Sequence, residues 1–128
     1  MKFFLDNCLS PRYAKSLDIL SERDSHSVVH LKDKFHRDAT DPEWIRGLKA
    51  EGDWVVVSGD TRILKTPELK AEWLNSGLTA FFLGTGWMNI AYWPQIGLLV
   101  RWWPSILEQA VGGERNRIRG ALSRTRQV

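Results

Sequence analysis

The sequence predicts an α/β fold: a four-stranded, mainly parallel sheet of strand order 2-1-3-4 with helices on both faces. Segments of strand type alternate along the chain with segments of helical periodicity, the pattern of parallel strands joined by crossover helices. The run Trp-Val-Val-Val-Ser at residues 54–58 also has no polar alternation, as expected of a central parallel strand covered on both faces.

The first part of the chain is expected to form a strand, a helix and a second strand. The apolar run at residues 2–5 stops at Asp6 and Asn7, which favour turns. A Ser-Pro pair then begins a helix over residues 10–23, and residues 26–31 form the second strand.

The middle of the chain adds a helix and the central strand. The helix covers residues 41–51, and Thr40 with Glu43 has the form of a capping box at its start. This local role is the favoured interpretation of Glu43, with metal binding as the alternative. Residues 54–58 form the third strand.

The remaining elements follow from helix-start and helix-stop signals. A helix begins at residues 66–68 and ends at Gly77, and residues 79–83 form the fourth strand. A glycine-containing loop leads into a Trp-rich C-terminal helix, in which Pro104 marks a kink or a break.

Length and charge indicate one domain with a basic extension. The 128 residues, with 43% hydrophobic and 26% charged residues, suit one globular domain, which we assign to residues 1–111. Residues 112–128 hold five arginines and one glutamate, so the rest of the chain is close to neutral. This basic tail is either a solvated end or an arm that contacts phosphates or a partner.

The composition argues against membrane and secreted classes. The most apolar segment, residues 88–110, is interrupted by charged residues and prolines, so no membrane span is expected. Cys8 is the only cysteine and cannot form an internal disulfide, and no signal-peptide stretch follows Met1. We therefore expect a cytoplasmic protein.

Three carboxylates are predicted to converge at one edge of the sheet. Asp6 follows the first strand and Asp60 follows the third, and these strands are neighbours at the switch point of a 2-1-3-4 sheet, where ligands bind. Asp41, in the first turn of the preceding helix, can reach the same place. Each acid also has a local interpretation: Asp6 and Asp60 as turn residues, and Asp41 as a favourable charge at a helix start.

Converging carboxylates need a positive charge, and a divalent cation can supply it. Oxygen ligands without clustered His or Cys suit Mg²⁺ or Mn²⁺ rather than zinc. His26 and His30 share one face of a predicted strand, so we do not expect them to bind metal. A hard cation can polarise a phosphodiester and activate water.

Three segments together resemble a known family. LDNCLSPRYAKSL begins at residue 5, TDPEWIRGLKAEG at residue 40 and WVVVSGDTRI at residue 54. Over residues 1–83 their order and spacing resemble the PIN-like domains related to VapC-type toxins. The resemblance implies a metal-dependent ribonuclease acting on RNA, the toxin half of a toxin–antitoxin pair with an antitoxin protein as partner.

The resemblance also implies roles for particular residues. Asp6, Asp41 and Asp60 would be the metal-binding and catalytic acids. Ser58 would be a hydroxyl that supports them, and Asn7 would lie beside the first acid.

Arg62 departs from the family pattern. Many members have a further acid two residues after the strand-three aspartate, where this chain has Arg62. This arginine weakens the case for a second metal, while its side chain could contact a phosphate. It also favours an alternative function, a protein-interaction module with a degenerate PIN-like metal site. A receiver-like phosphotransfer domain is a third interpretation, although the fourth strand lacks the lysine such domains use.

The C-terminal aromatic residues allow more than one interpretation. Trp87, Trp93, Trp102 and Trp103 crowd one region with Tyr92. The helix is expected to cover one face of the sheet, or alternatively to form a homodimer or antitoxin interface. Stacking of RNA bases on these rings is a further alternative.

Overall fold

The computed structural model describes residues 1–60, 62–84, 86–112 and 118–122. Its sheet is parallel and has the order β2-β1-β3-β4-β5. The predicted α/β fold and the order 2-1-3-4 are therefore confirmed, and a fifth strand extends the sheet beyond β4. The strands are β1 (Lys2–Leu5), β2 (Ser27–His30), β3 (Trp54–Ser58), β4 (Thr79–Leu83) and β5 (Ile118–Leu122).

The helices connect these strands in the expected order. The α-helices are α1 (Pro11–Ser21), α2 (Leu31–Lys34), α3 (Asp41–Glu51), α4 (Arg62–Lys65), α5 (Pro67–Leu74) and α6 (Tyr92–Gly112), and the 3-10 helices are η1 (Glu22–Asp24) and η2 (Trp87–Asn89). Helix α1 begins with Ser10 as its N-cap, because the Ser10 hydroxyl accepts from the backbone N–H of Arg12.

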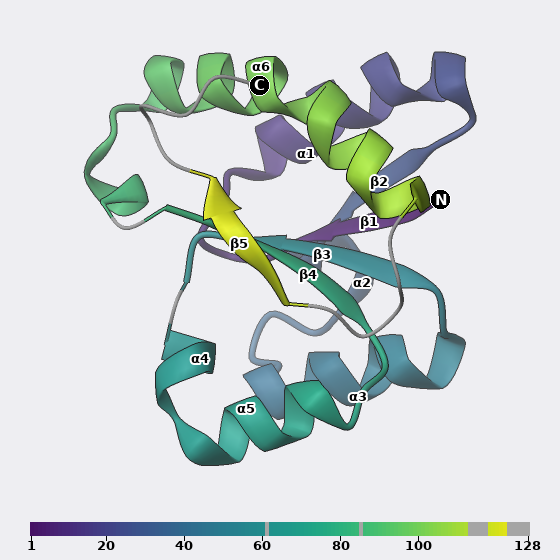
Figure 1. Ribbon diagram of the computed structural model, residues 1–128, viewed down its shortest axis with the longest axis vertical. Coiled ribbons are helices and arrows are strands. Elements are labelled where there is room, and N and C mark those ends of the chain that lie inside the picture. Colours follow the sequence, from purple (N-terminus) through teal and green to yellow (C-terminus); the bar gives the residue numbers. More distant parts are fainter. Residues whose placement is uncertain (61, 85, 113–117, 123–128) are drawn as a thin grey trace.

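Helices cover both faces of the sheet, with α1 and α6 on one side and α3 and α5 on the other (Figure 1). Successive residues of a strand point to opposite faces. In β3, Val55 and Val57 contribute to the core under α1 and α6, whereas Val56 packs with α3 and α5. Two apolar cores result, and they explain why the central strand is valine-rich throughout.

Most tryptophans belong to these cores. Trp44 and Trp54 are buried on the side of α3, and Trp87, Trp102 and Trp103 are buried on the side of α6. The prediction that α6 covers one face of the sheet is confirmed. In contrast, Trp93 is 77% exposed.

Some local features differ from the sequence prediction. Helix α4 was not predicted. At its start, the Asp60 side chain accepts a hydrogen bond from the backbone N–H of Arg62. Helix α6 continues across Pro104 as one element, although the proline ring removes one helical hydrogen bond. Strand β5 lies within the segment assigned to the basic tail, where arginines interrupt the apolar pattern; the remaining residues of that tail, apart from Gly112, lie outside the described part of the chain.

No helix in the described part of the chain is long and apolar enough to cross a membrane.

Candidate functional site

Asp6 lies at the carboxyl edge of the sheet, directly after β1, and is only 5% exposed. The parallel register pairs Leu5 with Val57, so the chain that leaves β1 runs beside Ser58. The Ser58 hydroxyl donates to Asp6 Oδ2 at 2.5 Å, and the backbone N–H of Cys8 donates to Asp6 Oδ1 at 3.1 Å. Both oxygens of the buried carboxyl group are thus held in place.

Burial raises the pKa of Asp6 to about 6, since a desolvated carboxylate is poorly stabilised. The hydrogen bonds from Ser58 and Cys8 oppose this shift, and the charges of Asp60 and Asp41 add to it. Negative charge from two other segments of the chain therefore acts on this one carboxyl group. Such a site is electrostatically suited to a cation.

Asp60 is joined to Asp6 through Ser58. Its backbone N–H donates to Ser58 Oγ at 3.0 Å, so the hydroxyl that donates to Asp6 also accepts from Asp60. The Asp60 side chain is only 11% exposed. The Ser58 hydroxyl thus links the acid that follows β1 to the acid that follows β3, the two acids that the sequence predicts to converge.

Arg62 pairs with Asp60 through two nitrogens. Its Nη2 donates to Asp60 Oδ2 at 2.5 Å, and its Nε lies 2.9 and 2.8 Å from the two carboxylate oxygens. These hydrogen bonds lower the pKa of Asp60 below its usual value. Arg62 therefore neutralises Asp60 from within the chain.

Asp41 is the first residue of α3, and its Oδ1 accepts from Trp44 Nε1 at 3.0 Å. Its charge raises the pKa of Asp6, so it acts electrostatically on the site. Glu43 completes the predicted capping box: its backbone N–H donates to Thr40 Oγ1, and its carboxylate accepts from the Thr40 N–H, each at 3.3 Å. The local interpretation of Glu43 is confirmed.

The structure thus brings Asp6, Ser58, Asp60 and Arg62 together through direct contacts, while Asp41 contributes through its charge. Asn7 is exposed in the turn beside Asp6. Within residues 1–60, 62–84, 86–112 and 118–122, no group of three or more His, Cys, Asp or Glu side chains forms a metal-binding cluster.

A pocket of about 490 Å³ opens beside the Asp60–Arg62 pair. We call it the α4 pocket, and its lining residues are Cys8, Gly59, Asp60, Arg62, Lys65, Gly84, Gly86, Trp87, Met88 and Asn89. The pKa of the Cys8 thiol is raised to about 12 by burial and by the charge of Asp6, so this thiol stays neutral and is a poor nucleophile.

Sequence reasoning missed Lys65 and the segment 86–89 as part of this site. Lys65 belongs to the helix that was not predicted, and the segment follows β4, which is adjacent to β3 in the sheet. The position of segment 86–89 directly after the fourth strand could have indicated its place in the site, because the carboxyl ends of neighbouring parallel strands meet at one edge of the sheet.

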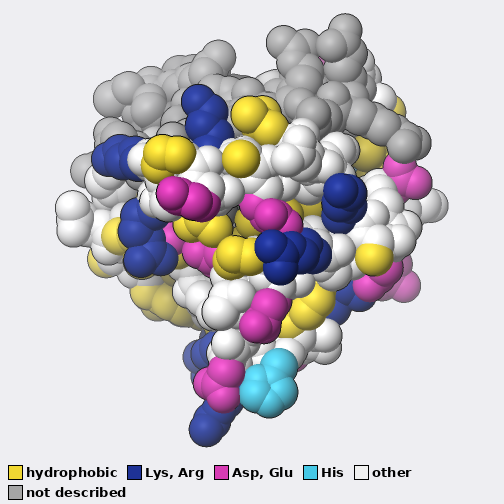
Figure 2. All heavy atoms as spheres, turned by 90° about the horizontal axis from the view of Figure 1, so that it is seen from below, with side chains coloured by type: hydrophobic (Ala, Val, Ile, Leu, Met, Phe, Trp, Pro, Cys, Tyr) yellow, Lys and Arg dark blue, Asp and Glu magenta, His cyan; other side chains and the backbone are white. Residues whose placement is uncertain are grey.

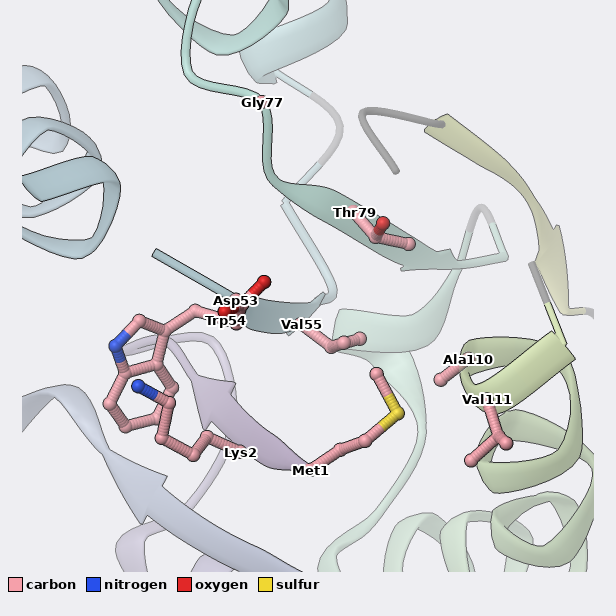
Figure 3. A pocket seen from close by; sticks show the side chains of 9 residues that line it. All are labelled: Met1, Lys2, Asp53, Trp54, Val55, Gly77, Thr79, Ala110 and Val111. Atoms are coloured by element: carbon pink, nitrogen blue, oxygen red, sulfur yellow. The ribbon is translucent and has the colours of Figure 1, made fainter. Parts of the chain in front are cut away.

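A second pocket, of about 390 Å³, lies at the opposite edge of the sheet, where the strands begin (Figure 3). Lys2, Trp54, Val55 and Thr79 contribute to its wall, together with Val111 of α6. Among the described residues that line it, Asp53 supplies the one carboxylate. The chemically active side chains are therefore concentrated at the carboxyl edge.

The surface over α3 and α5 carries charges of both signs. Figure 2 shows acidic and basic side chains interspersed with apolar ones on this face. A broad nucleic-acid interface would be expected to present one sign of charge. This face therefore does not have the charge pattern of a broad nucleic-acid interface, and we expect contact with a polyanion at a smaller site.

Comparison with models of protein families gives a match to a large part of the chain. The family model described as PIN like domain matches residues 1–85. No curated protein and no solved structure matches the chain. The matched region contains β1 to β4 and all three of the acids selected from the sequence.

Proposed function

The chain belongs to the PIN-like domain family, whose members are generally nucleases, and on this premise we propose that it is a Mg²⁺- or Mn²⁺-dependent endoribonuclease. We further propose that it acts as the toxin component of a VapC-like toxin–antitoxin pair. Its substrate would be RNA, and its products would arise by hydrolysis of a phosphodiester bond.

One observation carries this proposal: Ser58 holds the carboxyl group of Asp6 and the backbone of Asp60 at the switch point between β1 and β3. In open parallel sheets this crevice is where ligands bind. The raised pKa of Asp6 reflects burial near other negative charges. Carboxyl groups whose pKa is shifted in this way cluster at functional sites.

The donor set fits a hard divalent cation. Mg²⁺ is commonly bound by one or two carboxylates together with water and substrate phosphate, so a cage of three protein carboxylates is not required. Asp6 and Asp60 would hold the ion, with Asp41 as the third predicted acid. When bound, the ion would supply Lewis acidity to a phosphodiester oxygen and lower the pKa of a water molecule.

The residues of the chain itself have separable tasks. The Ser58 hydroxyl donates a hydrogen bond to Asp6 Oδ2, and this bond orients the carboxyl group and stabilises its charged form. The burial of Asp6 keeps bulk water away from this carboxyl group. Arg62, with a side chain that is 78% exposed, places a positive charge beside the crevice where an anionic substrate would lie.

The toxin proposal also requires a protein partner. Exposed apolar side chains on α6 and just before it provide a surface of suitable chemistry, and they include Met88, Tyr92, Trp93 and Val100. Aromatic residues of this kind are enriched at protein interfaces. An antitoxin protein, or a second copy of this chain, would be expected to contact this surface.

The decisive experiment compares Mn²⁺-dependent cleavage of RNA by the wild type, Asp6→Asn and Asp60→Asn. Both variants should lose roughly 100-fold or more in rate if these groups act in the reaction. Asp38→Asn is the matched control, because Asp38 is an exposed acid in the loop before α3. Full cleavage by Asp6→Asn and Asp60→Asn would refute the nuclease proposal.

A second candidate function rests on the Asp60–Arg62 pair. Because Arg62 already neutralises Asp60, the site could be a degenerate metal site in a protein-interaction module. Calorimetry with Mn²⁺ distinguishes the two. Binding by the wild type that is lost in Asp60→Asn supports the nuclease, whereas no binding by the wild type and binding by Arg62→Gln supports the degenerate site.

A further inference from the structure

The α4 pocket carries two positive charges on one short helix. Arg62 and Lys65 both line it, and α4 begins two residues after Asp60. Only one of these cations is needed to neutralise Asp60, and Arg62 does so. Lys65 is exposed, and the charge that it adds to the wall of the pocket has no role in the site described above.

We propose that the α4 pocket binds a backbone phosphate of single-stranded RNA, next to the bond addressed by Asp6 and Asp60. The identification of RNA rests on the proposed function. The subsite itself rests on the side chains that line the pocket, and it can be tested without any divalent cation.

Arg62 can contact a phosphate while it remains paired with Asp60. Its Nε and Nη2 donate to the carboxylate, yet 78% of the side chain is exposed. A guanidinium group is planar and carries five N–H donors, so its outer edge can bind an oxyanion bidentately. Asp60 fixes the orientation of this edge, which lowers the entropy lost on binding.

Trp87 supplies an independent observation at the same pocket. Its side chain is buried and lines the pocket, and its Nε1 has no hydrogen-bond partner among the described residues. The same edge of the ring lies against Gly59, because a Cβ atom at Gly59 would be 3.2 Å from Nε1. The buried indole ring therefore gives the pocket an aromatic wall beside Gly59.

The shape of the pocket suits a nucleotide rather than a free anion alone. Its volume of about 490 Å³ is in the range of small-ligand pockets and exceeds the space that one phosphate needs. Gly84 and Gly86 contribute no side chains to the wall, so the ligand can approach the backbone closely there. A sugar–phosphate unit fits such a space.

The test measures binding of a fluorescein-labelled short oligouridylate by anisotropy, in EDTA, for the wild type, Lys65→Gln and Arg62→Gln. Lys65→Gln should weaken binding several-fold and lower the slope of log affinity against log salt by about 0.7, as expected for one lost phosphate contact on a single strand. Arg62→Gln should do the same. Inorganic phosphate should displace the oligonucleotide better than chloride at equal ionic strength.

The matched control is Lys49→Gln. Lys49 is an exposed lysine near the end of α3, the helix that leads to the start of β3, and so it lies toward the opposite edge of the sheet. Its loss should leave affinity and salt slope unchanged. Equal affinity of Lys65→Gln and Lys49→Gln, or no binding by the wild type, would overturn the subsite.

The two proposals fail in different ways. Oligonucleotide binding that depends on Lys65, without RNA cleavage under any divalent cation, would keep the subsite and refute the nuclease. RNA cleavage by the wild type, together with an oligonucleotide affinity that is unchanged in Lys65→Gln and Arg62→Gln, would support the nuclease and refute the subsite.

Discussion

The hydroxyl group of Ser58 donates a hydrogen bond of 2.5 Å to the carboxyl group of Asp6, and this bond joins the carboxyl ends of β3 and β1. The same hydroxyl accepts from the backbone of Asp60. One fully buried oxygen therefore connects the two acids that the sequence selects. Its removal tests how far the site depends on that connection.

Ser58→Ala should lower the free energy of unfolding by roughly 1–3 kcal/mol near neutral pH, because it removes the hydrogen bond to Oδ2 of the buried Asp6 carboxylate and the acceptor of the Asp60 backbone N–H. Urea denaturation measures this change. Ser16→Ala is the control, since the exposed Ser16 hydroxyl donates to the carbonyl oxygen of Arg12 within α1. Equal stability of Ser58→Ala and the wild type would show that the bond contributes little.

Asp6→Asn should have the opposite effect. The pKa of Asp6 is raised to about 6 from an ordinary value near 3.8, so the folded protein holds this proton more strongly than the unfolded chain. The stability that comes from this stronger proton binding by Asp6 is therefore fully present at low pH, and it is lost as the pH rises through about 6. Removing the charge should stabilise the protein by up to roughly 3 kcal/mol above that pH.

Urea denaturation of Asp6→Asn and the wild type at about pH 4 and about pH 8 checks this prediction. The difference should be small at the lower pH and large at the higher one. A difference that does not depend on pH would mean that Asp6 is not the titrating group. If Asp6→Asn stabilises the protein and abolishes cleavage, Asp6 lowers the stability of the fold but supports activity, a trade-off that is common at functional sites.

The fold was predictable because local and tertiary signals agree. The valine run of β3 and the alternating elements define a parallel sheet, and the capping box defines the start of α3. Strand β5 was not predictable, because Arg119 and Gly120 break its apolar run, and its place beside β4 is a tertiary contact. Helix α4 is only four residues long, too short for a periodic pattern.

The candidate site was predictable in part for the same reason. The strand order places Asp6 near Asp60, since both follow adjacent parallel strands. The bidentate pairing of Arg62 with Asp60 depends on the local turn, and the contribution of Trp87 depends on how the chain returns after β4. The sequence alone therefore indicates which acids converge, but it does not indicate what faces them.

His30 should make the protein less stable in mild acid. It is fully buried, with Nε2 at 2.7 Å from the carbonyl oxygen of Leu9 and Nδ1 accepting from the N–H of Lys32. Burial lowers the pKa of His30 in the folded protein. Below an unfolded value near 6.5 the unfolded chain binds more protons, so stability decreases as the pH falls.

The measurement is the difference in unfolding free energy between the wild type and His30→Gln at about pH 7.5 and about pH 5.5. Asp6 is present in both proteins, so its titration largely cancels in the difference. The advantage of the wild type should shrink at the lower pH. A constant difference would contradict the assignment of a neutral, buried imidazole.

Gly59→Ala should destabilise the protein by roughly 1–3 kcal/mol, because an added Cβ would lie 2.6 Å from Cδ1 of the buried Trp87 ring. Gly97→Ala is the matched control: nothing lies within 4 Å of its Cβ position in α6, so this change should stabilise the helix by about 0.5–1 kcal/mol. In the double variant Gly59→Ala with Trp87→Phe, the smaller ring should recover part of the loss, and a double-mutant cycle by urea denaturation measures that coupling. If Gly59→Ala costs no more than Gly97→Ala, Trp87 moves aside easily, and the α4 pocket does not have a rigid wall at this position.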